Sequence, residues 1–216
     1  MEDVQPPAKL SRLDIGMLIT LVSVAIGGVV GLIAVLDADS EVGALGLGVG
    51  VTFLMLQGGA TIACGLACLA RRRLELVALG GLAAAGLAIV LFALAVWLEI
   101  DSETYVKIAG VAYVWSFFSL VVLGLTLATQ PVDPLARALY LGAVGASLLG
   151  GLIATALILS TGGGDIVPTA GPFPFAALGN EDLLRPLGAV LVIIATLWFG
   201  ALAASRVERP APDFTR

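Results

Sequence analysis

Long apolar runs alternate with short charged segments along the chain. About 20 apolar residues in an α-helix, at about 1.5 Å per residue, cross the roughly 30 Å hydrocarbon core of a bilayer. Six runs approach or exceed that length: residues 15–36, 42–69, 76–98, 108–129, 138–160 and 187–204. The pattern predicts an all-α polytopic membrane protein with six transmembrane helices. A single transmembrane domain, residues 12–205, would then lie between cytoplasmic tails at 1–11 and 206–216.

The composition agrees with this class. Of the 216 residues, 59% are hydrophobic and 12% are charged, and the mean hydropathy is +1.07. These values lie outside the usual range of soluble domains. The first run follows a polar tail with both signs of charge and has no small-residue cleavage site before Asp37. We therefore expect it to remain in the mature protein and not to act as a removable signal peptide.

A short acidic motif recurs at the bends between apolar runs. Residues 36–41 read LDADSE and residues 98–103 read LEIDSE, with four of six positions identical. A weaker copy at 181–188 repeats the acid, base and glycine spacing of 103–110. We predict three tandem helical hairpins, at about 12–70, 73–130 and 135–205, related as parallel repeats. The outer repeat motif comprises Asp39, Glu41, Asp101, Glu103, Lys107, Glu181 and Arg185.

Basic residues gather at one end of the predicted hairpins. Nine of the eleven Lys and Arg residues fall on the side of the N-terminus, whereas Lys107 and Arg185 fall on the other. Cytoplasmic loops are enriched in Lys and Arg, so we predict a plasma-membrane protein with both termini in the cytoplasm. We interpret the Arg71-Arg72-Arg73 bend as a topological anchor. Binding of anionic lipid headgroups is the alternative.

The predicted spans contain no Asp, Glu, Lys, Arg or His between their ends, and His is absent from the chain. Intramembrane charges usually serve ion pathways, catalysis or substrate pairing, so their absence argues against an ion-coupled transporter or an enzyme. Cys64 and Cys68 are the two cysteines, one helical turn apart, and imply neither a disulfide framework nor a metal cluster. We expect no catalytic residue, cofactor, metal, nucleotide or nucleic acid.

A few polar and aromatic residues at membrane depth are candidates for a solute pocket. Gln57 lies near the middle of its run, and the fourth run holds a cluster of rings and hydroxyls. We favour an interhelical hydrogen bond for Gln57, because a buried amide needs a partner, and a packing stripe for the cluster. Solute contact is the alternative. The candidates are Gln57, Tyr113, Trp115, Ser116 and Ser119.

The sequence also predicts where helices pack closely, how the fourth helix begins and where one long loop lies. Gly142, Ala146 and Gly150 recur every four residues, a spacing that lets helices approach closely. Ser102 is the predicted N-cap of the fourth helix, in which Glu103 and Lys107 are spaced to form an ion pair. The long loop 161–185 is apolar enough to lie on the outer interface, with a lid as one interpretation.

The function that these features favour is non-catalytic. We predict a structural, accessory or assembly subunit that packs against other membrane helices, with the lipid bilayer and a membrane protein or a second copy of the chain as partners. A carrier or facilitator for a small neutral or apolar solute is the alternative. The first hypothesis predicts that a partner or a second copy co-purifies with the chain. The second predicts saturable solute flux into vesicles that contain it.

Overall fold

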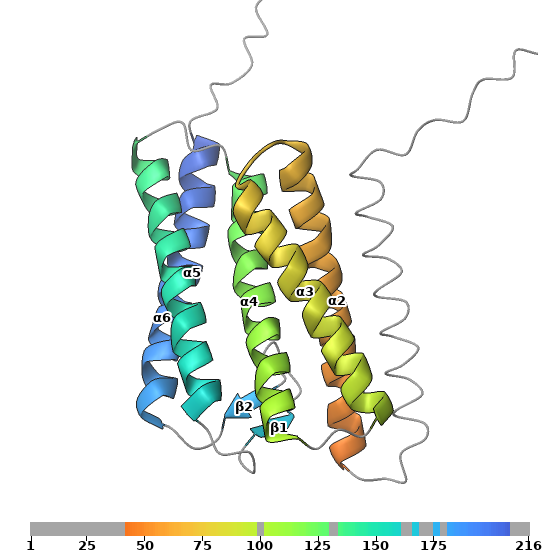
Figure 1. Cartoon of the computed structure of the whole chain (residues 1–216). Helices are drawn as coiled ribbons and strands as arrows, with labels where there is room; N and C mark the ends of the chain where they lie inside the picture. The colour runs from red at the N-terminus through yellow and green to blue at the C-terminus, as the bar shows by residue number, and fades with distance from the viewer. Residues whose placement is uncertain are drawn as a thin grey trace, which may run out of the picture.

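The computed structural model describes residues 42–98, 102–129, 134–160, 166–168, 175–177 and 181–207. This part of the chain forms a bundle of long helices with one short hairpin at an end (Figure 1). The helices are α2 (Val42–Ala70), α3 (Glu75–Leu98), α4 (Glu103–Ala128), α5 (Pro134–Ser160) and α6 (Glu181–Val207). All five are long and apolar enough to cross a membrane. The predicted first span, residues 15–36, lies outside the described residues, as do Asp39, Glu41 and Asp101.

Helix α6 begins earlier than predicted. The apolar run indicated a start at Leu187, but the helix starts at Glu181 and continues through Pro186. The prediction was wrong because a span was equated with its apolar residues, although a helix can continue beyond the hydrocarbon. Acidic residues are favourable in a first turn, and Glu181 and Asp182 occupy that position here. The last residues of the predicted loop 161–185 therefore belong to α6.

The loop between α5 and α6 also contains extended structure, which the all-α prediction did not include. Strand β1 (Ile166–Pro168) pairs antiparallel with β2 (Phe175–Ala177), and Val167 lies opposite Ala176. Figure 1 places this hairpin at the end of the bundle where α4 begins. Each strand is three residues long, so the fold remains helical and the hairpin is local to the loop.

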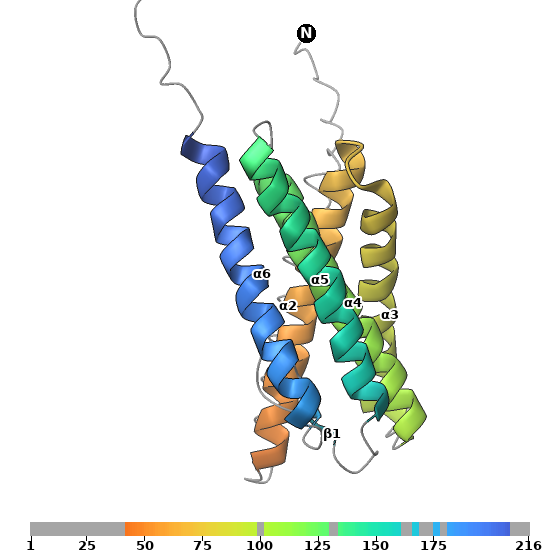
Figure 2. The same cartoon turned by 90° about the vertical axis from the view of Figure 1, so that its left-hand side faces the viewer.

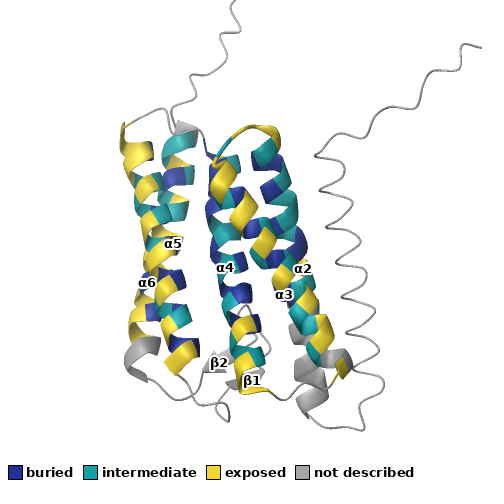
Figure 3. Ribbon diagram, in the orientation of Figure 1, coloured by how far each residue is buried: buried dark blue, intermediate teal, exposed yellow. Residues whose placement is uncertain are grey.

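Helix α4 lies at the centre of the described bundle. It packs against α2, α3 and α5, and α5 pairs in turn with α6 (Figure 2). Buried residues follow α4 along its length, whereas α3, α5 and α6 present exposed apolar side chains on their outer faces (Figure 3). An apolar exterior of this kind is compatible with lipid contact.

Glycines allow the helices to approach one another. A Cβ built on Gly58 of α2 would lie 2.8 Å from Cδ1 of Ile89 on α3, and one on Gly81 of α3 would lie 2.9 Å from Cβ of Ser119 on α4. On α5, a Cβ at Gly150 would lie 2.7 Å from Cε1 of Phe118. The predicted close-packing face of α5 is confirmed at Gly150. Much of the small-residue surface is thus used within the bundle.

The bend from α2 to α3 places two residues other than glycine in the left-handed region. The Arg73 amide donates to Cys68 O (2.9 Å) and the Arg72 amide to Leu69 O (3.1 Å), the pattern that commonly closes a helix C-terminus. Arg72 has a φ of 52° and Leu74 a φ of 46°. Glycine usually occupies the position of Arg72 because it has no Cβ.

Arg72→Gly is expected to raise the free energy of unfolding by about 1 kcal/mol, since it removes the Cβ conflict of a left-handed residue. Arg71→Gly is the matched control, because it removes the same charge from a neighbour that is outside that region. The control is expected to lower stability. Thermal unfolding in detergent measures the stability of both variants. If Arg71→Gly is also stabilised, the rise in stability comes from removing the charge and not from relieving the backbone of Arg72.

Candidate functional site: a buried polar cluster and an apolar groove

The most polar group inside the described bundle joins α2 to α4. Gln57 is 9% exposed, and its Nε2 donates to the carbonyl oxygen of Tyr113 at 3.2 Å. Tyr113 is 1% exposed and belongs to an apolar cluster with Leu54 and Ala88. The interhelical partner expected for Gln57 is therefore present. Its amide N–H is directed at the backbone of a neighbouring helix.

A second polar contact lies one turn further along α2. The Thr61 hydroxyl donates to Gln57 O at 2.8 Å and lies 3.2 Å from the hydroxyl of Ser116 and 3.3 Å from its carbonyl oxygen. Thr61 is 0% and Ser116 1% exposed. Thr61 was not among the predicted residues, although its position four residues after Gln57 puts both on one helical face. Among the described residues, every buried side-chain N or O atom has a hydrogen-bond partner.

The other two candidates, Trp115 and Ser119, contact helices other than α2. Trp115 lies against α5, where a Cβ on Gly151 would be 3.3 Å from its ring, and Ser119 lies against Gly81 of α3. The Tyr113 carbonyl and the Ser116 hydroxyl face α2, and the Tyr113 ring also packs against Phe92 of α3. Residues 113–119 therefore contribute to several helix interfaces around α4.

The outer repeat motif is described in part. Lys107 forms an ion pair with Glu103 at 2.5 Å, as its spacing predicted, and lies 3.4 Å from the carbonyl oxygen of Leu159 on α5. Ser102 precedes α4 in extended conformation, as predicted for an N-cap, but its side chain makes no capping hydrogen bond. Arg185 is exposed in the first turns of α6, and Glu181 begins that helix. The four motif residues that the structure describes thus lie in the first turns of α4 and α6.

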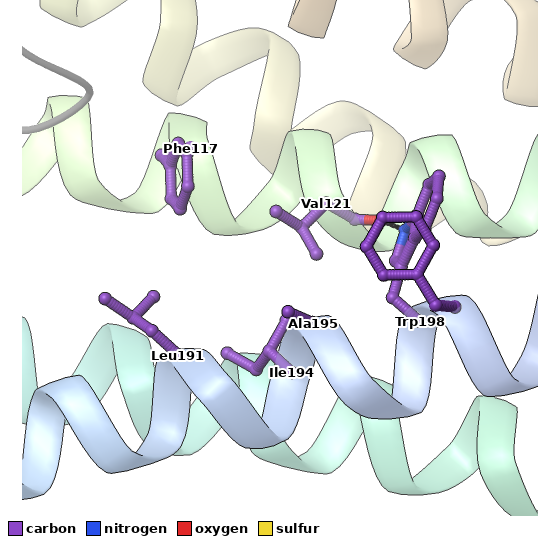
Figure 4. A pocket seen from close by; sticks show the side chains of 7 residues that line it. Phe117, Val121, Leu191, Ile194, Ala195 and Trp198 are labelled. Carbon is purple, nitrogen blue, oxygen red and sulfur yellow. Dashed lines mark hydrogen bonds between the residues drawn. The ribbon is translucent and has the colours of Figure 1, made fainter.

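An apolar groove of about 230 Å³ opens between α4 and α6. Side chains of α4 lie opposite those of α6 across it (Figure 4). It is closed at one end by Trp198, whose indole Nε1 donates to Val121 O at 3.3 Å. The lining residues are Phe117, Val121, Leu191, Ile194, Ala195, Trp198 and Phe199. None of the α6 residues that line the groove was predicted as a site residue, although residues 191, 194 and 198 are spaced along one helical face.

Both features are built from uncharged side chains. Among the described residues, no three His, Cys, Asp or Glu side chains gather as metal ligands. Cys64 and Cys68 are free thiols, and Cys68 Sγ lies 3.9 Å from Leu123 O in an apolar contact between α2 and α4. The cluster can fix helix register, and the groove can receive an apolar group.

Comparisons of this chain with protein-family models, with curated proteins and with solved structures found no match.

The α2–α4 polar contact is expected to contribute measurably to stability. Thr61→Val keeps the side-chain shape but removes the hydroxyl, and we expect a loss of about 0.6–1.7 kcal/mol, the range of interhelical hydrogen bonds in membrane proteins. Thr196→Val is the matched control, because Thr196 donates within its own helix, to Val192 O, from an exposed site. Its change should stay within about 0.5 kcal/mol. If Thr61→Val and Thr196→Val lose the same free energy of unfolding in a denaturant titration, the Thr61 hydroxyl does not stabilise the contact between α2 and α4.

Proposed function

We propose that this chain is a multi-pass plasma-membrane protein without catalytic activity that serves as a structural, accessory or assembly subunit. In this proposal six spans form three tandem hairpins with both termini in the cytoplasm. The described helices support it through their length and apolar exteriors. The satisfied polar interior also supports it, since Gln57, Thr61 and Thr126 make hydrogen bonds to a neighbouring helix.

Glycines on the outer faces carry the proposal. Gly80 on α3 and Gly145 on α5 are exposed, and a Cβ built on either meets no atom of another described helix within 4 Å. Glycine in a helix interior costs about 0.5–1 kcal/mol relative to alanine, and no contact within the described bundle requires it at these positions. Small residues let the backbone of another transmembrane helix come close. The partner we propose is such a helix, from another membrane protein or from a second copy of this chain.

The test places bulk on these two faces. Gly80→Leu and Gly145→Leu are expected to abolish recovery of a stoichiometric partner or homo-oligomer from mild detergent, because the added side chains keep a second backbone away. Ala93→Leu is the control, since Ala93 is also exposed on α3 but lies on a different side of that helix from Gly80. A monomeric wild-type chain with no partner would refute the proposal.

The second candidate is a carrier or facilitator for a small apolar or neutral solute, favoured by the groove between α4 and α6. Vesicles containing the chain would show saturable flux. Ala195→Leu, which fills the groove, should reduce flux of an apolar solute, whereas Gln57→Leu should reduce flux of a neutral polar one by removing the buried amide. Absence of flux across a panel of both solute classes would exclude this candidate.

A further inference from the structure

The bend that joins α2 to α3 concentrates positive charge at one end of the bundle. Arg71, Arg72 and Arg73 follow one another there, and the side chains of Arg71 and Arg72 are exposed. In the part of the chain that the structure describes, the ion pair joins Lys107 to Glu103 at the opposite end. Arg71 and Arg72 have no carboxylate partner among those residues, so their guanidinium groups can bind an anion from outside.

The third arginine fixes the bend to the bundle. Arg73 Nη1 donates to the carbonyl oxygen of Thr126 on α4 at 3.3 Å. The Thr126 hydroxyl lies 2.9 Å from the hydroxyl of Tyr140 on α5. Arg73 is therefore held by α4, whose Thr126 is linked in turn to α5, and it keeps the two exposed arginines next to α4.

Exposed apolar side chains follow directly after the arginines. Leu74 is 38% and Leu76 86% exposed. Figure 1 places the bend at the end of the bundle where α5 begins. Leucines that reach acyl chains and guanidinium groups that reach phosphates form the usual pairing at a membrane surface.

The backbone of Arg72 adds an independent argument. Its φ of 52° favours glycine, yet the position carries the long cationic side chain. A topological anchor depends on the number of charges near a span and not on which residue bears them. The presence of arginine at a position where glycine would fit better favours a role for this particular side chain.

We infer that residues 71–74 bind the phosphate of an anionic phospholipid headgroup, with Arg71 and Arg72 as ligands and Arg73 as a positioning residue. Guanidinium groups bind phosphate oxygens through paired N–H donors. The inference rests on the proposal that the helices span a bilayer. It is independent of whether the protein has a protein partner or carries a solute.

The test titrates phosphatidylglycerol onto the full chain in zwitterionic detergent and counts bound lipid by native mass spectrometry. The Arg71→Gln, Arg72→Gln double variant is expected to bind about 25-fold more weakly, about fivefold for each arginine. Glutamine has a Cβ, as arginine does. The strain of a left-handed residue at position 72 is therefore the same in the double variant and in the wild type. Arg185→Gln, an equal charge change at the opposite end, should leave binding unchanged.

Two further arms separate the possible sources of phosphate. Phosphatidylcholine should bind far more weakly than phosphatidylglycerol, and excess inorganic phosphate should not displace the bound lipid. Unchanged binding by the double variant, equal loss in Arg185→Gln, or displacement by inorganic phosphate would each overturn the lipid site. Extraction of the chain from membranes by alkaline carbonate would refute the membrane-spanning proposal instead, so the two failures are distinguishable.

Discussion

Gly150→Ala is expected to destabilise the folded chain by about 1–3 kcal/mol, the usual cost of overpacking a core. The new Cβ would lie 2.7 and 2.8 Å from two ring carbons of Phe118 and 3.3 Å from Cγ1 of Val190. Phe118 is 2% exposed, so its ring cannot swing away without displacing its neighbours. The helices must separate, or the ring must leave its rotamer.

Gly145→Ala is the matched control for this prediction. It makes the same chemical change on the same helix, but its new Cβ meets no atom of another helix within 4 Å among the residues that the structure describes. Because alanine is the better helix former, this variant is expected to stabilise by up to about 1 kcal/mol. Unfolding titrations in detergent measure both variants. Changes of the same sign would show that Gly150 is not a contact position.

Hydropathy alone predicts much of the described fold, because a bilayer requires a continuous apolar helix. The starts of α2 at Val42 and α3 at Glu75, and the end of α5 at Ser160, fall within one residue of the predicted runs. Hydropathy predicts the start of a helix less well where the first residues of the helix are polar. Helix α6 begins at Glu181, six residues before its apolar run, because solvated charges can continue a helix that the hydrocarbon does not require.

The candidate site was less predictable, since spacing along one helix does not identify the neighbour that each face meets. Gln57 had to find a partner, and the structure supplies it as the carbonyl of Tyr113. Residues 113–119 read as one cluster in sequence, but α4 is surrounded by other helices and distributes them among several interfaces. The contact of Trp198 could not be predicted from the sequence, because its hydrogen-bond partner is a backbone carbonyl of α4, which no side-chain pattern identifies.

The described bundle has two closely packed parts, α2–α3–α4 and α5–α6, that meet at α4. Phe118 lies at this junction. Its ring fills the space left by Gly150 and belongs to a buried cluster drawn from three helices. The cluster consists of Val114, Phe118, Ala154, Leu157, Ile158, Leu187, Val190 and Ile194. Loss of that ring should therefore act mainly on the attachment of α5 and α6 to α4.

Phe118→Ala is accordingly expected to lower the free energy of unfolding by about 3–5 kcal/mol, the usual cost of truncating a buried phenylalanine. Cys68 reports which part of the bundle opens, because it is 0% exposed between α2 and α4 and belongs to a different buried cluster. In a Cys64→Ala background, loosening of α5 and α6 alone should leave Cys68 protected from a thiol reagent. Rapid labelling in native detergent would show that the whole bundle depends on Phe118.

The double variant Phe118→Ala, Gly150→Ala tests the contact directly. With the ring removed, the Cβ at position 150 has space, so Gly150→Ala should no longer destabilise and should instead stabilise by up to about 1 kcal/mol through helix propensity. The two changes would then be coupled by about 1–4 kcal/mol, as expected for residues in direct contact. Additive losses would mean that Gly150 and Phe118 act on stability separately, and that another contact joins α5 to α4.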